Sequence, residues 1–571
     1  MPPIRKRYHT FDPSSGNNPK TSSAKRLRGG GGDDGGYEEY YEEIEEEPPI
    51  IEDAEEQECY EPEPNSSSSS NDNNDNEKSH WSRPSLKPHH LKNDRDIHMQ
   101  WLDIDMIGRE KALSKNPNPH KPVVGSTVGP VPVIRVFGVT DEGHSCSVFV
   151  HGFTPYGYFE LPEEWNEYFD RNNSHSAVEE LREMLNDRIR FGLKHNKVEE
   201  CVLSVQIVDD RSSILGYDVS SLSKSKKFVK VYVAMPNFVP VLVRVLKDGI
   251  SLRGMNAVDV QPYECNVPYV LRFMIDREAT GAGWLTLPAN TYATRTNADQ
   301  ETHCQLEVDI CYPEIIPHKA EGEWSKIAPL RILSFDIECQ GRPGKFPEAE
   351  RDPVIQIANS LTVYGEKSPR VKNVFTLKNC LPIVGAQVIT SEEEEDVLLK
   401  WRTFLQACDA DIITGYNVQN FDIPYLLDRA DALSKKSKAN ANKMRPFKLW
   451  GRIKGQPAKM RESTFQSAAY GKRNNVDTTI DGRVVFDMLP YMQRNHKLSS
   501  YTLNSVSSEF LGQQKEDVHH SIISTLQNGS DEDRHRLAVY CLKDALLPQR
   551  LMDKLSVMVN YVEMARVSDV I

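Results

Sequence analysis

Short apolar runs alternate with amphipathic stretches from Leu330 to about residue 550. The apolar runs have the length and β-branched content of buried strands, and the stretches between them have helical spacing. Strands are expected at 330–337, 354–362, 373–377 and 411–415, and helices at 393–408, 421–433 and 534–555, the last either extended to Ala565 or followed by another helix. Because helices that interleave with strands pack on the faces of one sheet, the pattern predicts an α/β domain over residues 330–550.

A turn signal lies near the end of this region. Asp481-Gly482 stands between two extended runs within residues 477–489. This dipeptide between such runs is typical of a β-hairpin, which we expect here.

The preceding region, residues 96–329, is also rich in strand-like runs. They occur at 132–138, 146–150, 157–161, 201–208 and 228–234, with helical periodicity at 178–191. The most apolar stretch, Phe228 to Leu246, contains prolines and charges and is too broken to span a membrane, and its valine-rich alternation predicts strands. The region therefore predicts a separate strand-rich α+β domain.

Residues 1–95 have the composition of a disordered tail. The 571-residue chain has a formal net charge of −14, but residues 33–64 alone contain 16 acidic residues and no Lys or Arg. The acidic balance therefore comes from one tract and does not exclude nucleic acid as a partner. A basic cluster at Lys25, Arg26 and Arg28 is equally well explained as a nuclear import signal or as a solvated charge run.

Several classes of protein are excluded. The N-terminus carries no apolar secretory signal, and no run of about 18 apolar residues predicts a membrane span. Ten cysteines occur without a CxxC pair, so we expect neither a zinc or iron–sulfur site nor a disulfide framework.

Three segments place carboxylates in unusual positions. Asp336 and Glu338 share one face of a strand, Asp422 lies at a strand-to-helix turn, and Tyr540 and Asp544 share one face of a helix. Each alone is better explained as a strand end, a helix cap or a surface acid. Together they are the hard oxygen ligands of two Mg²⁺ ions, or of Mn²⁺ as a substitute, that could hydrolyse a phosphodiester. Tyr540 would then hydrogen-bond the attacking water.

These segments resemble a known family. Phe335-Asp336-Ile337-Glu338, Asn417-x3-Phe421-Asp422 and Tyr540-x3-Asp544 are similar to the three exonuclease motifs of family B DNA polymerases. Further segments resemble one eukaryotic replicative branch of that family, and the resemblance extends from about residue 98 to Val567. These segments include Ile327–Arg331, Arg351–Gln356, Ser500–Asn504 and Leu537–Asp544.

The resemblance implies a ribonuclease H-like fold for residues 330–550 and 3′→5′ removal of mispaired nucleotides in DNA replication and proofreading. It implies that Asp336, Glu338, Asp422 and Asp544 bind two magnesium ions and that Tyr540 positions the water. Residues 96–329 would form the family's N-terminal domain with an OB-like part.

The resemblance also implies contacts with DNA and a nuclear location. Asn417 and Phe421 would contact the primer end, and a hairpin over about residues 467–487 would offer Lys472 and Arg473 to phosphates. Polymerase accessory subunits and a sliding clamp are implied as partners, although their main docking regions are not in this sequence.

The sequence departs from the family after Val567, and residues 551–571 would be the helical start of a polymerase region. Because the palm signatures are absent, we do not expect this polypeptide to polymerise DNA. Two alternatives are a non-catalytic interaction protein and an RNA-trimming exonuclease, of which the second fits the acids but not the flanking segments.

Overall fold

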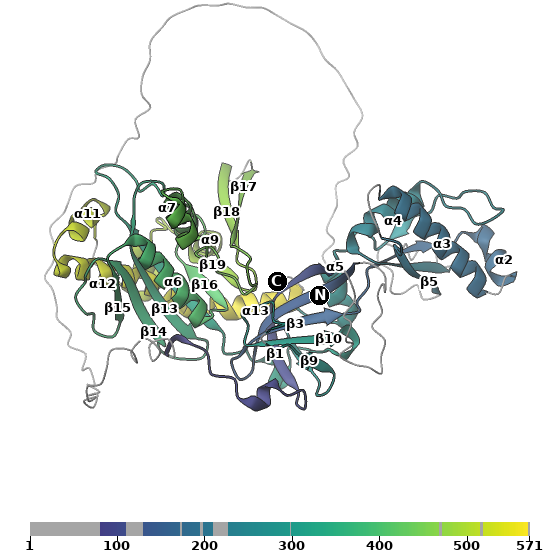
Figure 1. The fold of residues 1–571 in the computed structure, drawn as a ribbon, viewed down its shortest axis with the longest axis horizontal. Coiled ribbons are helices and arrows are strands. Elements are labelled where there is room, and N and C mark those ends of the chain that lie inside the picture. The colour runs from purple at the N-terminus through teal and green to yellow at the C-terminus, as the bar shows by residue number, and fades with distance from the viewer. Residues whose placement is uncertain are drawn as a thin grey trace, which may run out of the picture. The chain divides into compact units, whose positions relative to one another are not determined.

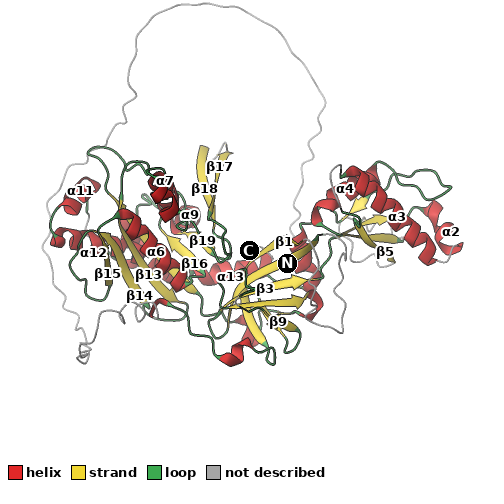
Figure 2. Cartoon of the chain, in the orientation of Figure 1, coloured by secondary structure: helices red, strands yellow, loops and turns green. Residues whose placement is uncertain are grey.

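The computed structural model describes residues 80–109, 130–171, 174–193, 198–208, 227–296, 298–467, 471–513 and 518–568. Figure 1 and Figure 2 draw these residues as coloured helices and strands. Among them, no helix combines the length and apolar character that crossing a membrane requires. The expectations about residues 1–79, including the import signal at Lys25, Arg26 and Arg28, lie outside the described residues.

A six-stranded mixed sheet forms the C-terminal half, in the order β15-β14-β13-β12-β16-β19. Only β13 runs antiparallel to the others. From β14 to β19 the chain order is therefore 3-2-1-4-5 with an antiparallel second strand, which is the expected ribonuclease H-like arrangement. The strands are β12 (Arg331–Cys339), β13 (Val354–Val363), β14 (Val371–Leu377), β15 (Gln387–Ser391), β16 (Ile412–Gly415) and β19 (Val484–Asp487).

Helices cover both faces of this sheet (Figure 2). Successive residues of a strand point to opposite faces, so Leu333 and Phe335 of β12 pack with Trp401 of α6 (Glu394–Cys408). On the other face, Ala358 of β13 packs with Ala538 of α12 (Asp531–Lys554). The alternation of strands and helices in the sequence is thus confirmed as an α/β fold.

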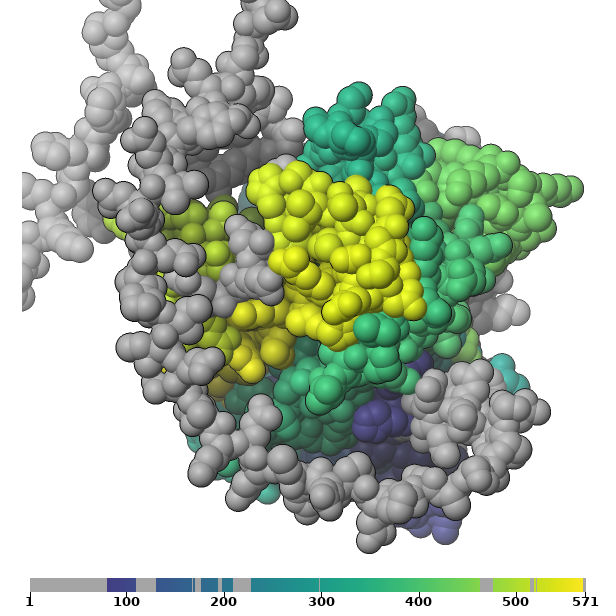
Figure 3. Space-filling view, turned by 90° about the vertical axis from the view of Figure 1, so that its left-hand side faces the viewer, coloured from purple at the N-terminus to yellow at the C-terminus, as the bar shows by residue number. Residues whose placement is uncertain are grey.

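Capping residues set the bounds of the C-terminal helices. α12 starts three residues before the expected 534, because Ser530 and Asp533 form a reciprocal capping box. Ser556, with φ of +52°, separates α12 from α13, so a second helix follows and α12 is not extended. Figure 3 shows the yellow residues of this C-terminal part at the surface. The remaining helices of this half are α7 (Asp422–Ser434), α8 (Lys438–Met444), α9 (Met488–Asn495), α10 (Leu503–Leu511), α11 (His520–Asn528) and α13 (Val557–Ser568).

The expected hairpin is displaced in the structure. β17 (Lys459–Ser467) pairs with β18 (Gly471–Thr479), whereas the turn signal placed a hairpin at 477–489 around Asp481-Gly482 and the resemblance placed one at about 467–487. Asp481-Gly482 is a turn, but the strands on its two sides belong to different sheets. The prediction was wrong because β19 pairs with β16 in the large sheet.

A second, seven-stranded sheet lies in the N-terminal half and is the OB-like part, which we call the barrel. β1, β2 and β3 form an antiparallel meander, and β10 lies parallel to β3. β8 pairs with β1 and β9 pairs with β10, so these two strands, which follow each other in the chain, lie toward opposite ends of the row. The strands are β1 (Ile97–Arg109), β2 (Val131–Thr140), β3 (Ser145–His151), β8 (Trp284–Leu287), β9 (Tyr292–Thr294) and β10 (Leu306–Cys311), with β11 (Ile316–His318) beside β8 and with α5 (Tyr269–Arg277) against the same core.

The chain between β3 and β8 builds a second core, so residues 96–329 contain two. A four-stranded sheet, β5-β6-β4-β7, packs against helices around Phe159, Trp165 and Leu242. The predicted strands over Phe228–Leu246 are wrong after β6, because Val239–Lys247 form helix α4, which has a proline in its first turn. The elements are β4 (Tyr156–Glu160), β5 (Val202–Val208), β6 (Phe228–Val233), β7 (Pro262–Tyr263), α2 (Glu163–Arg171), α3 (Ser174–Gly192) and α4.

Residues 80–91, which we call the strap, are ordered although composition assigned them to the tail. Trp81 packs edge-on against Phe404 in the core beneath the large sheet. Arg83 donates to Asp409 Oδ2 at 2.8 Å, to Asp411 Oδ1 at 2.5 Å and to the carbonyl oxygen of Gly143 in the barrel at 2.9 Å. The strap therefore joins the barrel to the α/β domain through a buried cation.

Arg83→Met should lower the free energy of unfolding by about 3 kcal/mol, because it leaves buried carboxylates with one cation fewer. Arg370→Met is the matched control, since Arg370 pairs with Glu366 at the surface and its loss should cost less than about 1 kcal/mol. Urea denaturation of both variants measures the difference. Equal losses would contradict the role assigned to the strap.

Candidate metal centre

The central strand β12 presents two carboxylates to α12. Asp336 and Glu338 point to the face opposite Phe335 and Ile337, which are in the core with α6. The residue paired with Asp336 on β13 is Ala358, whose small side chain leaves room between the sheet and the helix. The two acids therefore face a helix across a narrow space.

Asp422 reaches the same strand because β16 is shorter than β12. β16 pairs with Ile332–Ser334, so beyond Ser334 the edge of β12 that faces β16 has no strand beside it among the residues that the structure describes. Asp422, the first residue of α7, occupies that edge, where its Oδ1 accepts from the backbone N–H of Ile337 at 3.2 Å. Gly415 permits this approach, since a Cβ there would lie 2.7 Å from the carbonyl oxygen of Phe335.

The loop between Gly415 and Asp422 is held by Asp487 at the end of β19. Its carboxylate accepts from the N–H groups of Asn417 at 2.8 Å and Gln419 at 3.1 Å. It also accepts from Leu489 N at 2.9 Å and so caps α9. Sequence reasoning missed Asp487, although an acid between a strand and a helix is a capping signal. Asn417 has a φ of +66°, so the chain turns through the left-handed backbone region at this point of the loop.

α12 brings three side chains to the carboxylates of β12. Tyr540 and Asp544 lie one turn apart and hydrogen-bond each other, and Asp544 is buried. Cys541, which the sequence reasoning did not single out, donates to Asp336 Oδ2 with a sulfur–oxygen distance of 3.5 Å. The structure thus brings together all five predicted side chains, Asp336, Glu338, Asp422, Tyr540 and Asp544.

Burial and mutual repulsion govern the electrostatics of this cluster. Burial, followed by the charges of Asp422, Asp544 and Glu338, raises the pKa of Asp336 well above its usual value. Burial and the charges of Asp487 and Asp544 raise the pKa of Asp422 to about 7, against the opposing effect of its backbone hydrogen bonds. Because a cation between them would favour the ionised forms, this donor set fits a divalent metal with oxygen ligands.

Phe421, the residue before Asp422, forms an aromatic pair with Phe346 next to the carboxylates. Its ring is half-buried and lies edge-on to Phe346, with ring centroids 5.5 Å apart. Phe346 is 73% exposed and belongs to the loop between β12 and β13. Sequence reasoning missed Phe346, although a phenylalanine among the glycines and prolines of residues 341–347 is a signal for an exposed loop aromatic.

The predicted basic residues Lys472 and Arg473 lie on β18. Their backbones pair with Gln466 and Phe465 of β17. Their side chains are outside what the structure describes, so their contact with phosphates stays a prediction.

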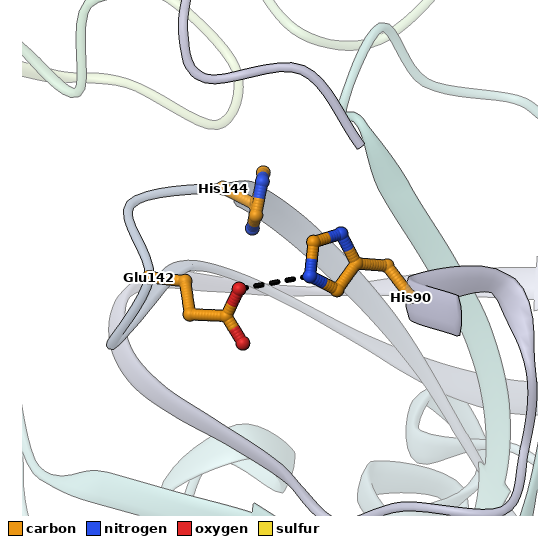
Figure 4. A group of neighbouring side chains, drawn as sticks. All are labelled: His90, Glu142 and His144. Carbon is orange, nitrogen blue, oxygen red and sulfur yellow. Dashed lines mark hydrogen bonds and ion pairs between the residues drawn. The ribbon is translucent and has the colours of Figure 1, made fainter. Parts of the chain in front are cut away.

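A second group of candidate metal ligands lies where the strap meets the turn between β2 and β3. Figure 4 shows His90, Glu142 and His144 close together. His90 Nδ1 accepts from the N–H of Lys87 at 2.9 Å, so its Nε2 carries the proton that it donates to Glu142 at 2.8 Å. His90 is therefore oriented as a hydrogen-bond donor, and the group joins the strap to the turn between β2 and β3.

Comparisons with known proteins agree with this geometry. The sequence model "DNA polymerase family B, exonuclease domain" matches residues 260–506, which include Asp336, Glu338 and Asp422. The chain is 47% identical over 86% of its length to the DNA polymerase delta catalytic subunit of Arabidopsis thaliana, covering 42% of that protein. It is 44% identical over 86% of its length to the same subunit of Drosophila melanogaster, covering 43% of it.

One of the solved structures that match the chain is an archaeal polymerase. It is described as the family B DNA polymerase from the hyperthermophilic archaeon Pyrobaculum calidifontis, with a TM-score of 0.48 and 22% identity over 80% of this chain and 46% of the other. The chain thus spans less than half the length of the relatives that it matches. Within those bounds the chain is similar to DNA polymerase delta catalytic subunits, and its residues 260–506 match the exonuclease domain of family B DNA polymerases.

Proposed function

We propose that this chain is a 3′→5′ exodeoxyribonuclease that removes terminal nucleotides from DNA, acting in proofreading during nuclear DNA replication. The observation that carries the proposal is the convergence of Asp336, Glu338, Asp422 and Asp544 with Tyr540 between β12, α7 and α12. The family match and the relatives support the same reaction class. The proposal covers hydrolysis alone and makes no claim of DNA polymerisation.

The four carboxylates would hold two Mg²⁺ ions, with Mn²⁺ as a substitute. Such ions, when bound, activate a water and stabilise the leaving oxygen of a phosphodiester. Burial and the charges of Asp544, Glu338 and Asp336 raise the pKa of Tyr540, so its phenol stays protonated near neutral pH. A protonated phenol can donate a hydrogen bond and hold a water in place, but it cannot act as the base.

The substrate would be a single-stranded 3′ end. Phe421 and the exposed ring of Phe346 offer faces on which unstacked bases can lie, since stacking on aromatic rings is largely independent of sequence. Asn417 lies in the loop that leads to Phe421, and Lys472 and Arg473 on the hairpin would contact phosphates. Accessory subunits and a sliding clamp stay predictions from the family.

The metal-free protein should become less stable as pH rises. Folded Asp422 has a pKa of about 7, against about 3.9 in an unfolded chain, so between these values the folded state holds a proton that the unfolded state has lost. The free energy of unfolding should therefore fall, on the order of a few kcal/mol, between about pH 4 and about pH 7. Thermal unfolding in chelator measures this loss, and added Mg²⁺ should restore stability at the higher pH. A slope that Asp422→Asn leaves unchanged would contradict the assignment.

Asp336→Asn combined with Glu338→Gln should reduce Mg²⁺-dependent degradation of single-stranded DNA by at least about 10³-fold, because the pair loses the charges that hold the ions. Release of nucleotides from a 3′-labelled oligonucleotide measures the rate. The control Glu366→Ala removes an exposed acid from the turn after β13 and should leave the rate unchanged. Retained activity in the double variant would overturn the proposal, and faster hydrolysis of an RNA 3′ end would favour the RNA-trimming alternative.

Phe346→Ala should weaken binding of a single-stranded 3′ end at least about fivefold, which corresponds to about 1 kcal/mol of lost stacking. Fluorescence anisotropy with a short oligonucleotide measures the dissociation constant. The matched control is Phe191→Ala, since Phe191 is 90% exposed and lies on α3, which packs on the β5-β6-β4-β7 sheet and not on the sheet of the metal centre. Equal effects of the two substitutions would exclude Phe346 as a base-stacking residue.

A further inference from the structure

A single sulfur atom lies among the carboxylate oxygens of the metal centre. Cys541 Sγ is 3.5 Å from Asp336 Oδ2 and 3.6 Å from the backbone oxygen of Asp336. Candidate ligand atoms of Asp336, Glu338 and Cys541 all lie within 4.8 Å of one another. Cys541 is fully buried, so its side chain faces the carboxylates and not solvent.

The surrounding helix face explains how the sulfur comes so close. Ala538, Cys541 and Ala545 are the small residues of α12 that pack on Ala358 and Val374 of the sheet. Small side chains allow the helix to approach the strands closely, and alanines provide that packing on both sides of Cys541. Packing therefore does not require a sulfur at residue 541. The sulfur places a polarisable atom beside Asp336 and Glu338.

The distances match those between two ligands of one soft metal ion. Zinc–sulfur bonds are about 2.3 Å and zinc–oxygen bonds about 2.0–2.2 Å, so two such ligands of a tetrahedral ion lie roughly 3.5 Å apart. The observed distance between Cys541 Sγ and Asp336 Oδ2 is 3.5 Å. Thiolate sulfur selects Zn²⁺ and Cd²⁺, whereas Mg²⁺ takes oxygen ligands.

We propose that Cys541 gives this carboxylate site a soft ligand, so that Zn²⁺ or Cd²⁺ binds Asp336, Glu338 and Cys541 and inhibits hydrolysis. The inhibitory part rests on the proposed function, whereas binding of the soft ion does not. On binding, the sulfur–hydrogen bond is replaced by a sulfur–metal bond, and the proton leaves to solvent. The bound ion then occupies carboxylate oxygens that the hydrolytic ions need.

The first test is a titration of the full-length, metal-free chain with CdCl₂, followed by the ultraviolet absorption of cadmium–thiolate bonds. We expect a saturable band in the wild type that is lost in Cys541→Ala and in Cys541→Ser. The serine variant has nearly the shape of cysteine and keeps a hydrogen-bond donor, so it carries the test if the alanine variant fails to fold. Cys380→Ala, which removes a more accessible cysteine on the same domain, should keep the band.

The second test is inhibition of Mg²⁺-dependent hydrolysis by Cd²⁺, with each variant compared with its own uninhibited rate. The Cd²⁺ concentration that halves the rate should rise at least about tenfold in Cys541→Ser and should not change in Cys380→Ala. An unchanged band and unchanged inhibition in Cys541→Ser would overturn the inference. A Cys541-dependent band in a chain that never hydrolyses DNA would support the metal site and overturn the proposed function.

Discussion

The organisation of the metal centre depends on the place where one strand loses its neighbour. β16 accompanies β12 only as far as Ser334, and the backbone of β12 beyond that point needs another partner. Asp422 supplies it through the N–H of Ile337, and this bond places a third carboxylate beside the two that β12 carries itself. α12 then closes the space from the other face of the sheet. The charges are thus brought together by backbone pairing and helix packing, against their own repulsion.

A second buried charge cluster stabilises the surroundings of the site. Burial alone would raise the pKa of Asp409, but Arg452, Arg83 and Arg483 outweigh it and hold the pKa well below its usual value. Asp411 pairs with Arg83 and Arg452 and also accepts from the backbone N–H of Arg331 at the start of β12. The two clusters differ in the source of the positive charge that compensates their carboxylates. Arginines neutralise this one, whereas the carboxylates at the other end of β12 call for a metal ion.

Local patterns in the sequence were sufficient for much of the fold. The strands and helices of the large sheet follow from period-two and helical spacing, and the paired position of Asp336 and Glu338 follows from strand geometry alone. Contacts between residues that lie far apart in the sequence could not be predicted from local patterns. The sequence near Asp481 favours a hairpin locally, but β19 gains more by extending the sheet beside β16. Trp81 and Arg83 lie in a polar stretch, and their hydrogen bonds reach Gln387 and Asp409, more than 300 residues away in the chain.

The same limit applies to the site residues. Asp487 acts through backbone groups of a loop 70 residues earlier in the chain, which no local pattern reveals. Cys541 is one small residue on an apolar helix face, and its meaning depends on the strand opposite. The three motifs were found because each places its acid at the end of an element or on one helix face.

Gly415 has a consequence beyond its own position. A Cβ there would meet the side chain of Val418 and also the main chain of Phe335, and the main chain cannot rotate away as a side chain could. Any heritable substitution at residue 415 must therefore push β16 and α7 apart from β12 and displace Asp422, although every ligand would keep its identity. On the proposed proofreading function, a chain altered in this way would keep every metal-ligand residue and still allow copying errors to accumulate.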